Sequence, residues 1–320
     1  MYSGVSVIIC CYNSAKRLPE TLRHLAVQEV PCHIPWEIIV VNNASTDDTV
    51  QVAEQEWAKY NLSLPFRIVN QPNPGLSNAR DKGFEVAAYE CCLFCDDDNW
   101  LQKDYVRIAF ETMESDTMIG AVGGRGEPKV CKEKRSLWKK LNKIGYGIGA
   151  QHNASGDITN IRGQIYGAGA IFRRSSYFDL KESRFVSLLS DRKGNMLSSG
   201  GDTELCLALV LRGYKIYYSE HLRFKHFIPE ERISSEYVFR MKKEKEHSRI
   251  PISLYRYKVF NPEIFYDKYL WWKELGYSFK MGVKNMGCDS EVYHFRYCLR
   301  LVKDRKKFHE TKRTINCLFE

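Results

Sequence analysis

A run of apolar residues, Cys91 to Cys95, ends abruptly in three carboxylates, Asp96, Asp97 and Asp98. Apolar runs of this length are typical of buried strands. Because burying an unpaired carboxylate is costly, we expect the three aspartates to emerge at the strand end, near water or a cation. Two aspartates one residue apart suit a hard divalent ion that keeps open positions for phosphate oxygens. The alternative interpretation is an acidic turn that begins the next helix.

Strand-like and helix-like segments alternate through the first half of the chain. The patterns predict strands over Val5–Cys10, Glu37–Val41, Phe66–Val69 and Cys91–Cys95, with helices over Pro19–Val27, from Ser45 as N-cap onward, and over Leu76–Ala88. Such alternation indicates a parallel sheet covered on both faces, and ligands of these sheets gather at the carboxyl ends of the strands. The polar segments Cys11–Asn13, Asn42–Asn43 and Asp96–Asp98 follow three of the strands, so we expect them to converge on one edge.

The second half is less regular. Arg125–Asn160 is rich in Lys and Gly, and we expect a long excursion over the site or a plain surface insertion. The apolar, glycine-containing segment Tyr166–Phe172 predicts a strand, where small residues allow close approach of backbone. Gly200–Glu204 then leads into a predicted helix over Leu205–Arg212, and Lys215–Tyr218 predicts a short strand.

Five segments in this order resemble the motifs of a glycosyltransferase of family 2 with the GT-A fold. They are Val7–Asn13, Ile38–Thr49, Asn73–Gly75 with Ala79-Arg80, Asp96–Asp98 as the DxD motif, and Gly201–Leu205 as the region of the acceptor-side Glu-Asp motif. The resemblance implies an α/β fold: a mixed, mostly parallel, Rossmann-like sheet flanked by helices. It covers about residues 5–231, so we predict a catalytic domain over 1–231, with a donor-binding half over 1–124 and an acceptor-side half over 161–231.

The resemblance implies an inverting transfer of a sugar from a nucleoside diphosphate, we expect UDP, to an acceptor hydroxyl. A divalent metal, Mn²⁺ or Mg²⁺, would stabilise the charge on the departing diphosphate. Asp98 is the implied metal ligand, Asp96 would hold ribose or metal-bound water, and Asp97 would orient the turn. His226 could complete the metal shell or touch the diphosphate; alternatively it is a packed core histidine.

Asp202 is the implied general base, which takes the acceptor proton as the oxygen attacks the anomeric carbon. Its alternative role is an N-cap for the following helix. Two departures from the family pattern bear on the site. Asn42 stands where the family usually has Asp and accepts a hydrogen bond less strongly than a carboxylate would. Gly201 replaces the Glu of the Glu-Asp pair, so Asp202 lacks an acidic neighbour in sequence.

The remaining implied site residues concern the nucleotide. Cys11, Tyr12 and Asn13 would lie against the nucleobase, by stacking and hydrogen bonding. Arg80 would bind the base or the phosphates; its alternative is an exposed helix arginine.

The formal charge of +9 is unevenly placed along the 320 residues. Residues 1–231 hold 28 Lys and Arg against 28 Asp and Glu, whereas residues 232–320 hold 20 against 11. The region 232–320 is also rich in Tyr, Trp and Phe, and its C-terminal part predicts a helix with an apolar stripe beside a basic one. The stripes are Val292, Phe295, Leu299 and Val302, and Arg296, Arg300, Lys303 and Lys307. A mainly helical extension that meets an anionic membrane surface is one prediction; a helix packed on the catalytic domain is the other. No nucleic-acid-binding motif accompanies the charge.

The bulk composition narrows the class of protein. Hydrophobic residues make up 44% and charged residues 27%, as in a soluble globular chain. The only CxxC spacing among the eleven cysteines, Cys92–Cys95, lies inside an apolar strand-like run and has no second CxxC to complete a zinc site, which favours reduced thiols in a cytoplasmic protein. We read no signal peptide and no spanning segment, and therefore expect a cytoplasmic protein, peripheral on the inner membrane face if the C-terminal region binds lipid. The acceptor would be a glycan or lipid-linked saccharide of surface polysaccharide synthesis. The alternative function is a catalytically silent nucleotide-sugar-binding or assembly subunit.

Overall fold

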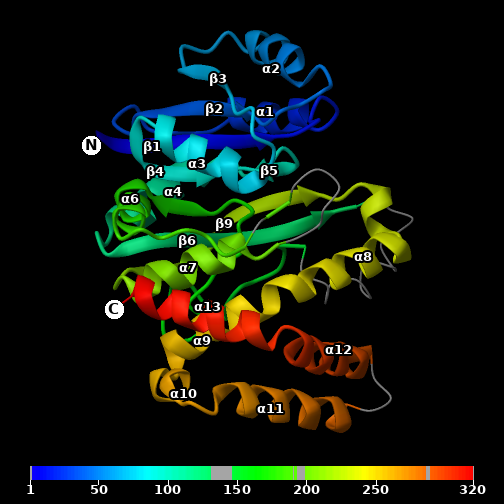
Figure 1. The fold of residues 1–320 in the computed structure, drawn as a ribbon. Coiled ribbons are helices and arrows are strands. Elements are labelled where there is room, and N and C mark those ends of the chain that lie inside the picture. Colours follow the sequence, from blue (N-terminus) through cyan, green and yellow to red (C-terminus); the bar gives the residue numbers. More distant parts are fainter. Residues whose placement is uncertain (1, 131–145, 190, 193–198, 286–288, 320) are drawn as a thin grey trace.

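A nine-stranded mixed sheet organises the chain (Figure 1). The structure, a computed structural model, describes residues 2–130, 146–189, 191–192, 199–285 and 289–319, and side chains of 289–293 are not described. Four parallel strands form one part of the sheet: β1 (Tyr2–Cys11), β2 (Trp36–Asn42), β3 (Phe66–Asn70) and β4 (Tyr89–Phe94). The first four predicted strands are thus confirmed.

The sheet continues beyond β4 with strands of mixed direction. These are β8 (Ile171–Arg173), β6 (Ile119–Lys129), β9 (Lys215–Phe227) and β5 (Asn99–Leu101), in the overall order β3-β2-β1-β4-β8-β6-β9-β5, with β7 (Gly156–Asp157) beside β9. β8 is antiparallel to β4 and β6, and β9 is parallel to β6. The register of β5 with β9 pairs Asn99 with His226, which brings His226 beside the aspartates that precede β5.

Alternating side chains of β1 supply the two cores on either face of the sheet. Val7 and Ile9 pack with helices α1 (Leu18–Ala26), α2 (Thr49–Ala58) and α4 (Tyr105–Glu114) on one face. Ile8 packs on the other face with α3 (Leu76–Val86), α6 (Arg174–Glu182) and α7 (Gly201–Leu211). Successive residues of a strand point to opposite faces, so an apolar run such as Val7–Ile9 is what a doubly covered sheet requires.

Four predicted elements differ from the structure. The helix predicted over Leu205–Arg212 begins four residues earlier, at Gly201. The second helix begins at Thr49 rather than after Ser45, because the Asp47 carboxylate accepts a hydrogen bond from the Thr49 amide at 3.1 Å and holds residues 45–48 in a loop. The strand predicted over Tyr166–Phe172 is wrong except at its end, where β8 begins at Ile171. Gly169 has a φ of +67°, which no extended strand adopts. The short strand predicted over Lys215–Tyr218 extends to Phe227.

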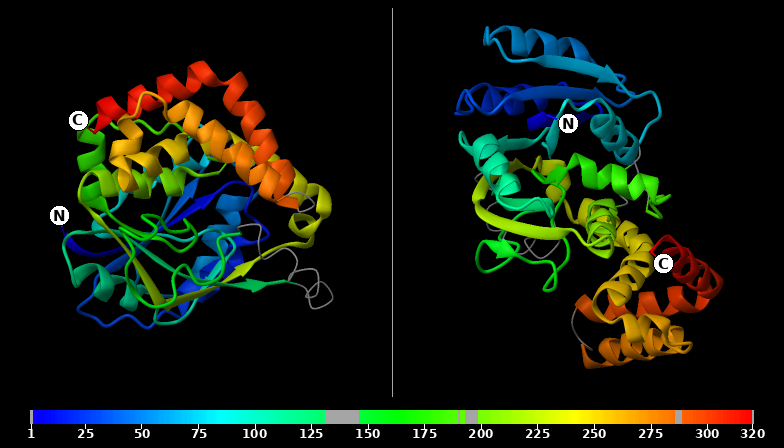
Figure 2. Two further views of the ribbon diagram at one scale, coloured as in Figure 1. Left: turned by 90° about the horizontal axis from the view of Figure 1, so that it is seen from below. Right: turned by 90° about the vertical axis from the view of Figure 1, so that its left-hand side faces the viewer.

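Helices fill the described part of residues 232–320, as predicted. They are η3 (Glu230–Ile233), α8 (Ser235–Lys245), η4 (Glu246–Ser248), α9 (Arg249–Phe260), α10 (Pro262–Tyr266), α11 (Leu270–Lys284), α12 (Asp289–Lys303) and α13 (Arg305–Leu318). Figure 2 shows α9 to α13 as a layer against the α7 side of the sheet. Leu254, Leu301 and Phe308 share the same buried cluster as Ile8, so these helices continue the core of the sheet.

The predicted apolar stripe of α12 is not its packed face. Tyr297 and Leu301 are buried, whereas Leu299 and Val302 are 72% and 58% exposed. Val292 lies outside the described side chains, as do residues 131–145 of the predicted excursion. Within the described residues, no helix combines the length and the hydrophobicity that crossing a bilayer requires.

Candidate active site

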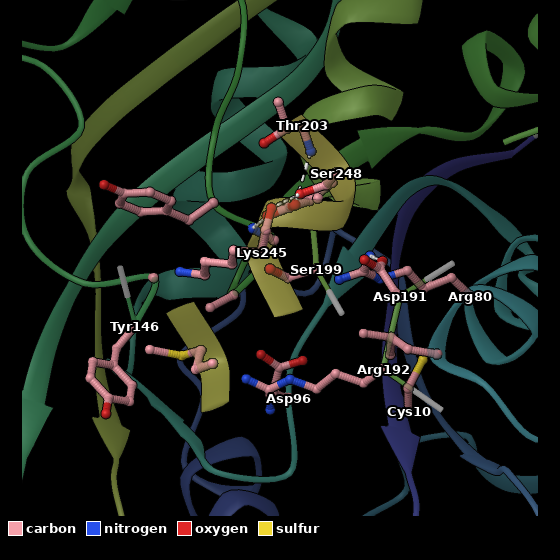
Figure 3. A pocket seen from close by; sticks show the side chains of 18 of the residues that line it. Cys10, Arg80, Asp96, Tyr146, Asp191, Arg192, Ser199, Thr203, Lys245 and Ser248 are labelled. Atoms are coloured by element: carbon pink, nitrogen blue, oxygen red, sulfur yellow. Dashed lines mark hydrogen bonds and ion pairs between the residues drawn. The ribbon is translucent and has the colours of Figure 1, made fainter. Parts of the chain in front are cut away.

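A cavity of about 820 Å³ lies at the carboxyl ends of β1 and β4 (Figure 3). The predicted site residues that line it are Cys11, Tyr12, Arg80, Asp96, Asp97, Asp98, Asp202 and His226. Asn13 and Asn42 are described but are not among the lining residues. The topology therefore brings predicted site residues as far apart in sequence as Cys11 and His226 to a single cavity.

Asp97 is a structural member of the aspartate triplet. Its carboxylate is buried and accepts hydrogen bonds from Arg17 Nη2 at 2.5 Å, from Arg17 Nε at 3.1 Å and from the Ser14 hydroxyl. The Thr21 hydroxyl donates to the Asp97 carbonyl at 2.8 Å. Asp97 thus fixes the turn after β4 to the start of α1. Its predicted place beside the nucleotide sugar stays a prediction.

Asp98 lines the cavity, and its carboxylate lies between the Arg232 guanidinium and the His226 imidazole. Arg232 Nη1 lies 2.8 Å from one carboxylate oxygen and His226 Nε2 lies 3.4 Å from the other. Burial alone would raise the pKa of Asp98, but His226 and Arg232 outweigh it and hold that pKa well below its usual range. Asp98 is therefore an anion in the folded protein.

Asp96 has a different environment from its neighbours. Its carboxylate accepts a hydrogen bond from the side-chain amide of Asn99 at 3.2 Å. Burial and the charge on Asp98 raise the pKa of Asp96, because two adjacent carboxylates resist ionising together. A bound cation would relieve this repulsion, so the pair Asp96 and Asp98 is the part of the site that favours a positive charge.

The donor set fits a divalent ion that takes most of its ligands from a substrate. Within the described residues there is no group of three or more His, Cys, Asp and Glu placed to enclose a metal. Mg²⁺-type sites commonly use only one or two carboxylates together with substrate phosphates, and Asp96 and Asp98 can supply these. The buried His226 Nδ1 has no hydrogen-bond partner, whereas Nε2 faces Asp98.

Asp202 lies in the first turn of α7, inside the helix rather than at its N-cap, which is Gly200. One carboxylate oxygen accepts a hydrogen bond from the Gly167 amide at 2.8 Å, and the other accepts from the Thr203 amide at 2.9 Å. A Cβ on Gly167 would come within 2.7 Å of Arg80 Nη2 and 3.2 Å of the Asp202 side chain, so glycine leaves room for both side chains. The loop that was predicted as a strand thus holds the predicted base.

Asp191 supplies an acidic group where the sequence lacks one. Its carboxylate accepts a hydrogen bond from the Gly201 amide at 2.9 Å and pairs with Arg80 Nη1 at 2.8 Å (Figure 3). A Cβ on Gly201 would come within 2.4 Å of Asp191 Oδ2. The carboxylate of Asp191 therefore occupies the space in which a side chain at position 201 would begin.

Arg80 is largely buried and forms an ion pair. Its side chain is 16% exposed and is held by Asp191. Burial would lower the pKa of Arg80, but Asp191 and Asp202 outweigh burial and raise it. The exposed-helix alternative for Arg80 is wrong. Asp191 lies 111 residues from Arg80 and gave no local signal, so sequence analysis missed it.

Asn13 and Asn42 join the loops that frame the cavity. Asn13, with a φ of +51°, accepts a hydrogen bond from the Thr46 amide at 2.8 Å through its side chain. Asn42 donates to Asn70 at 3.0 Å and accepts from the Ser45 amide at 3.3 Å. These contacts position the ends of β1, β2 and β3 relative to one another. Their predicted contacts to a nucleotide stay predictions.

Curated relatives match part of the chain. Poly-β-1,6-N-acetyl-D-glucosamine synthase of Staphylococcus epidermidis is 26% identical over 183 residues, which cover 55% of this chain and 41% of that protein. Poly(ribitol-phosphate) β-N-acetylglucosaminyltransferase TarS of Staphylococcus aureus is 34% identical over 130 residues, 39% of this chain and 22% of TarS. The chain thus spans less than half the length of these two relatives.

Solved structures share the fold over most of the chain. Residues 1–349 of S. aureus TarS in complex with UDP-GlcNAc align with 98% of this chain and 90% of that one, at 18% identity and a TM-score of 0.55. The mannosyltransferase PcManGT of Pyrobaculum calidifontis, in complex with GDP-Man and Mn²⁺, aligns with 79% of this chain and 63% of its own, at 18% identity and a TM-score of 0.52. At this identity the likeness shows the fold, which is the GT-A type predicted.

The family assignment comes from the sequence profile described as "Glycosyl transferase family 2". This profile matches residues 6–178, more than half of the chain. The match includes β1, β2 and the aspartate triplet, and the fold and the cavity described above agree with it. The chain belongs to glycosyltransferase family 2.

Proposed function

We propose that this protein is an inverting glycosyltransferase that moves a sugar from a nucleoside-diphosphate donor to an acceptor hydroxyl. The observation that carries the proposal is the meeting of Asp202 with Asp96 and Asp98 in one cavity. An inverting displacement needs a base on the acceptor side and charge stabilisation on the leaving-group side. Asp202 can supply the base, and Asp96 and Asp98 would hold the cation that stabilises the leaving diphosphate.

Asp202 takes the acceptor proton in this proposal. The Gly167 and Thr203 amides fix its carboxylate, so the base is oriented before substrate binds. Arg80 and Asp191 lie behind it and hold the first turn of α7 in place. The exposed ring of Tyr12, which is 44% exposed at the cavity wall, is placed to stack on the nucleobase.

A divalent metal, Mn²⁺ or Mg²⁺, would be held by Asp98 with help from Asp96 and the donor's own phosphate oxygens. When bound, it would neutralise the charge of the departing diphosphate. Arg232 now holds the Asp98 oxygen at 2.8 Å, so metal binding requires this guanidinium to share or leave that oxygen. His226 remains a candidate to contact the metal or the diphosphate.

UDP-sugar is the proposed donor, and a glycan or lipid-linked saccharide of surface polysaccharide synthesis is the proposed acceptor. The donor proposal is supported by the TarS structures that contain UDP and UDP-GlcNAc. The acceptor proposal is supported by relatives whose names describe synthesis of poly-β-1,6-N-acetyl-D-glucosamine and glycosylation of poly(ribitol phosphate).

The decisive experiment measures nucleotide release from a panel of nucleotide sugars with Mn²⁺ or Mg²⁺, with saccharide acceptors, for the wild type and Asp202→Asn. We expect a loss of 10²–10⁴-fold in rate, the usual contribution of a positioned base, with donor-dependent thermal stabilisation retained. Asp104→Asn, a half-exposed aspartate outside the cavity, is the matched control. Unchanged turnover in Asp202→Asn would remove the base assignment. Donor binding without modification of any acceptor would support a silent nucleotide-sugar-binding subunit.

A peripheral membrane position is a separate part of the proposal. Exposed apolar side chains of α11 and α12, including Trp272, Phe279 and Leu299, lie within the basic region 232–320. Such a mixture suits an anionic lipid surface, because rings enter the interface while lysines meet headgroups. Sedimentation with vesicles containing phosphatidylglycerol should fall when these three residues become Ser. Val27→Ser, an exposed apolar residue on α1's C-cap, should bind as the wild type does; equal sedimentation of both variants would exclude this surface.

A further inference from the structure

One stripe of residues on α8, η4 and α9 faces the cavity. Its members follow one another at intervals of one, three or four residues, as on one side of a helix: Tyr237, Arg240, Met241, Lys245, Ser248, Arg249, Ile252, Ser253 and Arg256. The residues joining α8 to α9 keep right-handed helical dihedrals, with Lys245 at φ −61° and ψ −22° and Arg249 at φ −65° and ψ −43°. The two helices therefore present a single, nearly continuous side to the cavity.

The stripe carries positive charge without negative charge. It holds Arg240, Lys245, Arg249 and Arg256, whereas the glutamates of the same segment, at positions 236, 244 and 246, are not among the residues that line the cavity. Arg256 donates to the Gln164 amide oxygen at 2.7 Å, and the Arg249 guanidinium lies 3.6 Å from the centre of the Tyr297 ring. The cations are therefore placed by protein contacts on the cavity wall.

The whole lining has the same bias. Among the described residues that line the cavity there are eight Arg and Lys and five Asp. On the donor side, Arg17, Arg232 and Arg80 are matched by ion pairs with Asp97, Asp98 and Asp191. Four of the five other cations of the lining, Arg240, Lys245, Arg249 and Arg256, lie on the α8–α9 side.

The stripe is too long to serve the donor alone. From Tyr237 to Arg256 it extends over roughly 30 Å at the rise of an α-helix. A donor diphosphate is two adjacent phosphoryl groups, and it can contact only a short part of such a stripe. The middle of the stripe lies near the chemistry, since the Lys245 ammonium interacts electrostatically with Asp202 and Ser248 and Ile252 lie beside Gly200 at the start of α7.

We propose that the acceptor is an anionic chain, carrying phosphate or carboxylate groups on successive units, which lies along the α8–α9 stripe with its hydroxyl at Asp202. This inference rests on the proposed function, because it assigns the stripe to the acceptor of that reaction. Repeated charges along the chain match repeated cations along the helices, and the hydroxyls of Ser248 and Ser253 can bind sugar or polyol oxygens between them.

The test measures binding rather than turnover, so it can fail independently of the proposed function. Calorimetric titration of the full chain, saturated with UDP, would compare oligo(glycerol phosphate), oligogalacturonate and neutral maltoheptaose. We expect one or both anionic oligomers to bind at least tenfold more tightly than maltoheptaose, with affinity falling as salt rises. The two anionic oligomers distinguish phosphate from carboxylate.

Arg240→Gln and Arg256→Gln should each weaken binding of the preferred anionic oligomer by about 5- to 10-fold, while UDP affinity stays within twofold. Arg296→Gln is the matched control, because Arg296 lies on α12 at a different surface cavity and should leave both affinities unchanged. Equal binding of maltoheptaose, loss of UDP affinity in both stripe variants, or tighter binding of an oligothymidylate of equal charge would each overturn the proposal.

Discussion

The ion pair between Arg80 and Asp191 allows a quantitative test of how the active-site wall is built. The two side chains are 16% and 6% exposed, and their charged atoms are 2.8 Å apart. Asp191→Ala would leave the Arg80 guanidinium buried without this carboxylate. Removing one partner of a buried pair typically costs about 3–5 kcal/mol. We therefore expect the free energy of unfolding to fall by about that amount.

Surface ion pairs give the comparison that this reasoning needs. Arg212 and Asp179 lie at nearly the same distance, 2.7 Å, but are 38% and 31% exposed. An exposed pair is worth about 0.2–1 kcal/mol, so Asp179→Ala should cost far less than Asp191→Ala. Burial, rather than separation, is therefore the variable that the two variants isolate.

Urea unfolding followed by circular dichroism would measure both variants, together with Arg80→Met and the double variant Arg80→Met/Asp191→Ala. Because the double variant buries no unpaired charge, it should be more stable than the sum of the two single changes predicts. A cost of less than about 1 kcal/mol for Asp191→Ala, or strict additivity in the cycle, would refute the argument that this pair is buried and coupled.

Two other predictions use buried titratable groups. Glu204 is fully buried. Burial raises the pKa of Glu204, although hydrogen bonds from Ser187 and the backbone oppose this effect. The stabilising contribution of Glu204 is therefore complete below the ordinary Glu pKa and is lost as pH rises through the raised pKa. The stability advantage of the wild type over Glu204→Gln should therefore shrink from pH 5 to pH 8 in urea unfolding, and a growing advantage would contradict it. Burial also raises the pKa of Cys10 to about 12, although Cys10 lines the cavity. At pH 8, iodoacetamide should label the exposed Cys32 and Cys317 well before the partly buried Cys10, as peptide mass spectrometry would show; equal rates would be inconsistent with a raised pKa of the Cys10 thiol.

The parts of the fold that were predictable are those with a local signal. Val5–Cys10 and Cys91–Cys95 are continuous apolar runs, and a strand buried on both faces has that pattern. The aspartates follow directly, so their place at the sheet edge needs no knowledge of distant contacts. Tyr166–Phe172 is also largely apolar, but its first five residues form a loop, which the hydrogen bond from Gly167 ties to Asp202, 35 residues further on.

What could not be predicted depends on residues far apart in the chain. Nothing near Asp191 indicates that it pairs with Arg80 or meets Gly201. The packed face of α12 was predicted wrongly for a different reason. Its sequence contains two apolar stripes, and tertiary packing buries the one that contains Leu301 and leaves Leu299 exposed.

The close approach of Asp191 to Gly201 has an evolutionary consequence. Positions 191 and 201 compete for a single volume, so a homologue with the same backbone can carry a bulky acid at one of them but not at both. A column-by-column comparison would score the glycine as a lost functional group. When the two positions are compared together, homologues with an acidic residue at one should have a small residue at the other. The negative charge beside the N-terminus of α7 would then be kept, although a different position of the sequence supplies it.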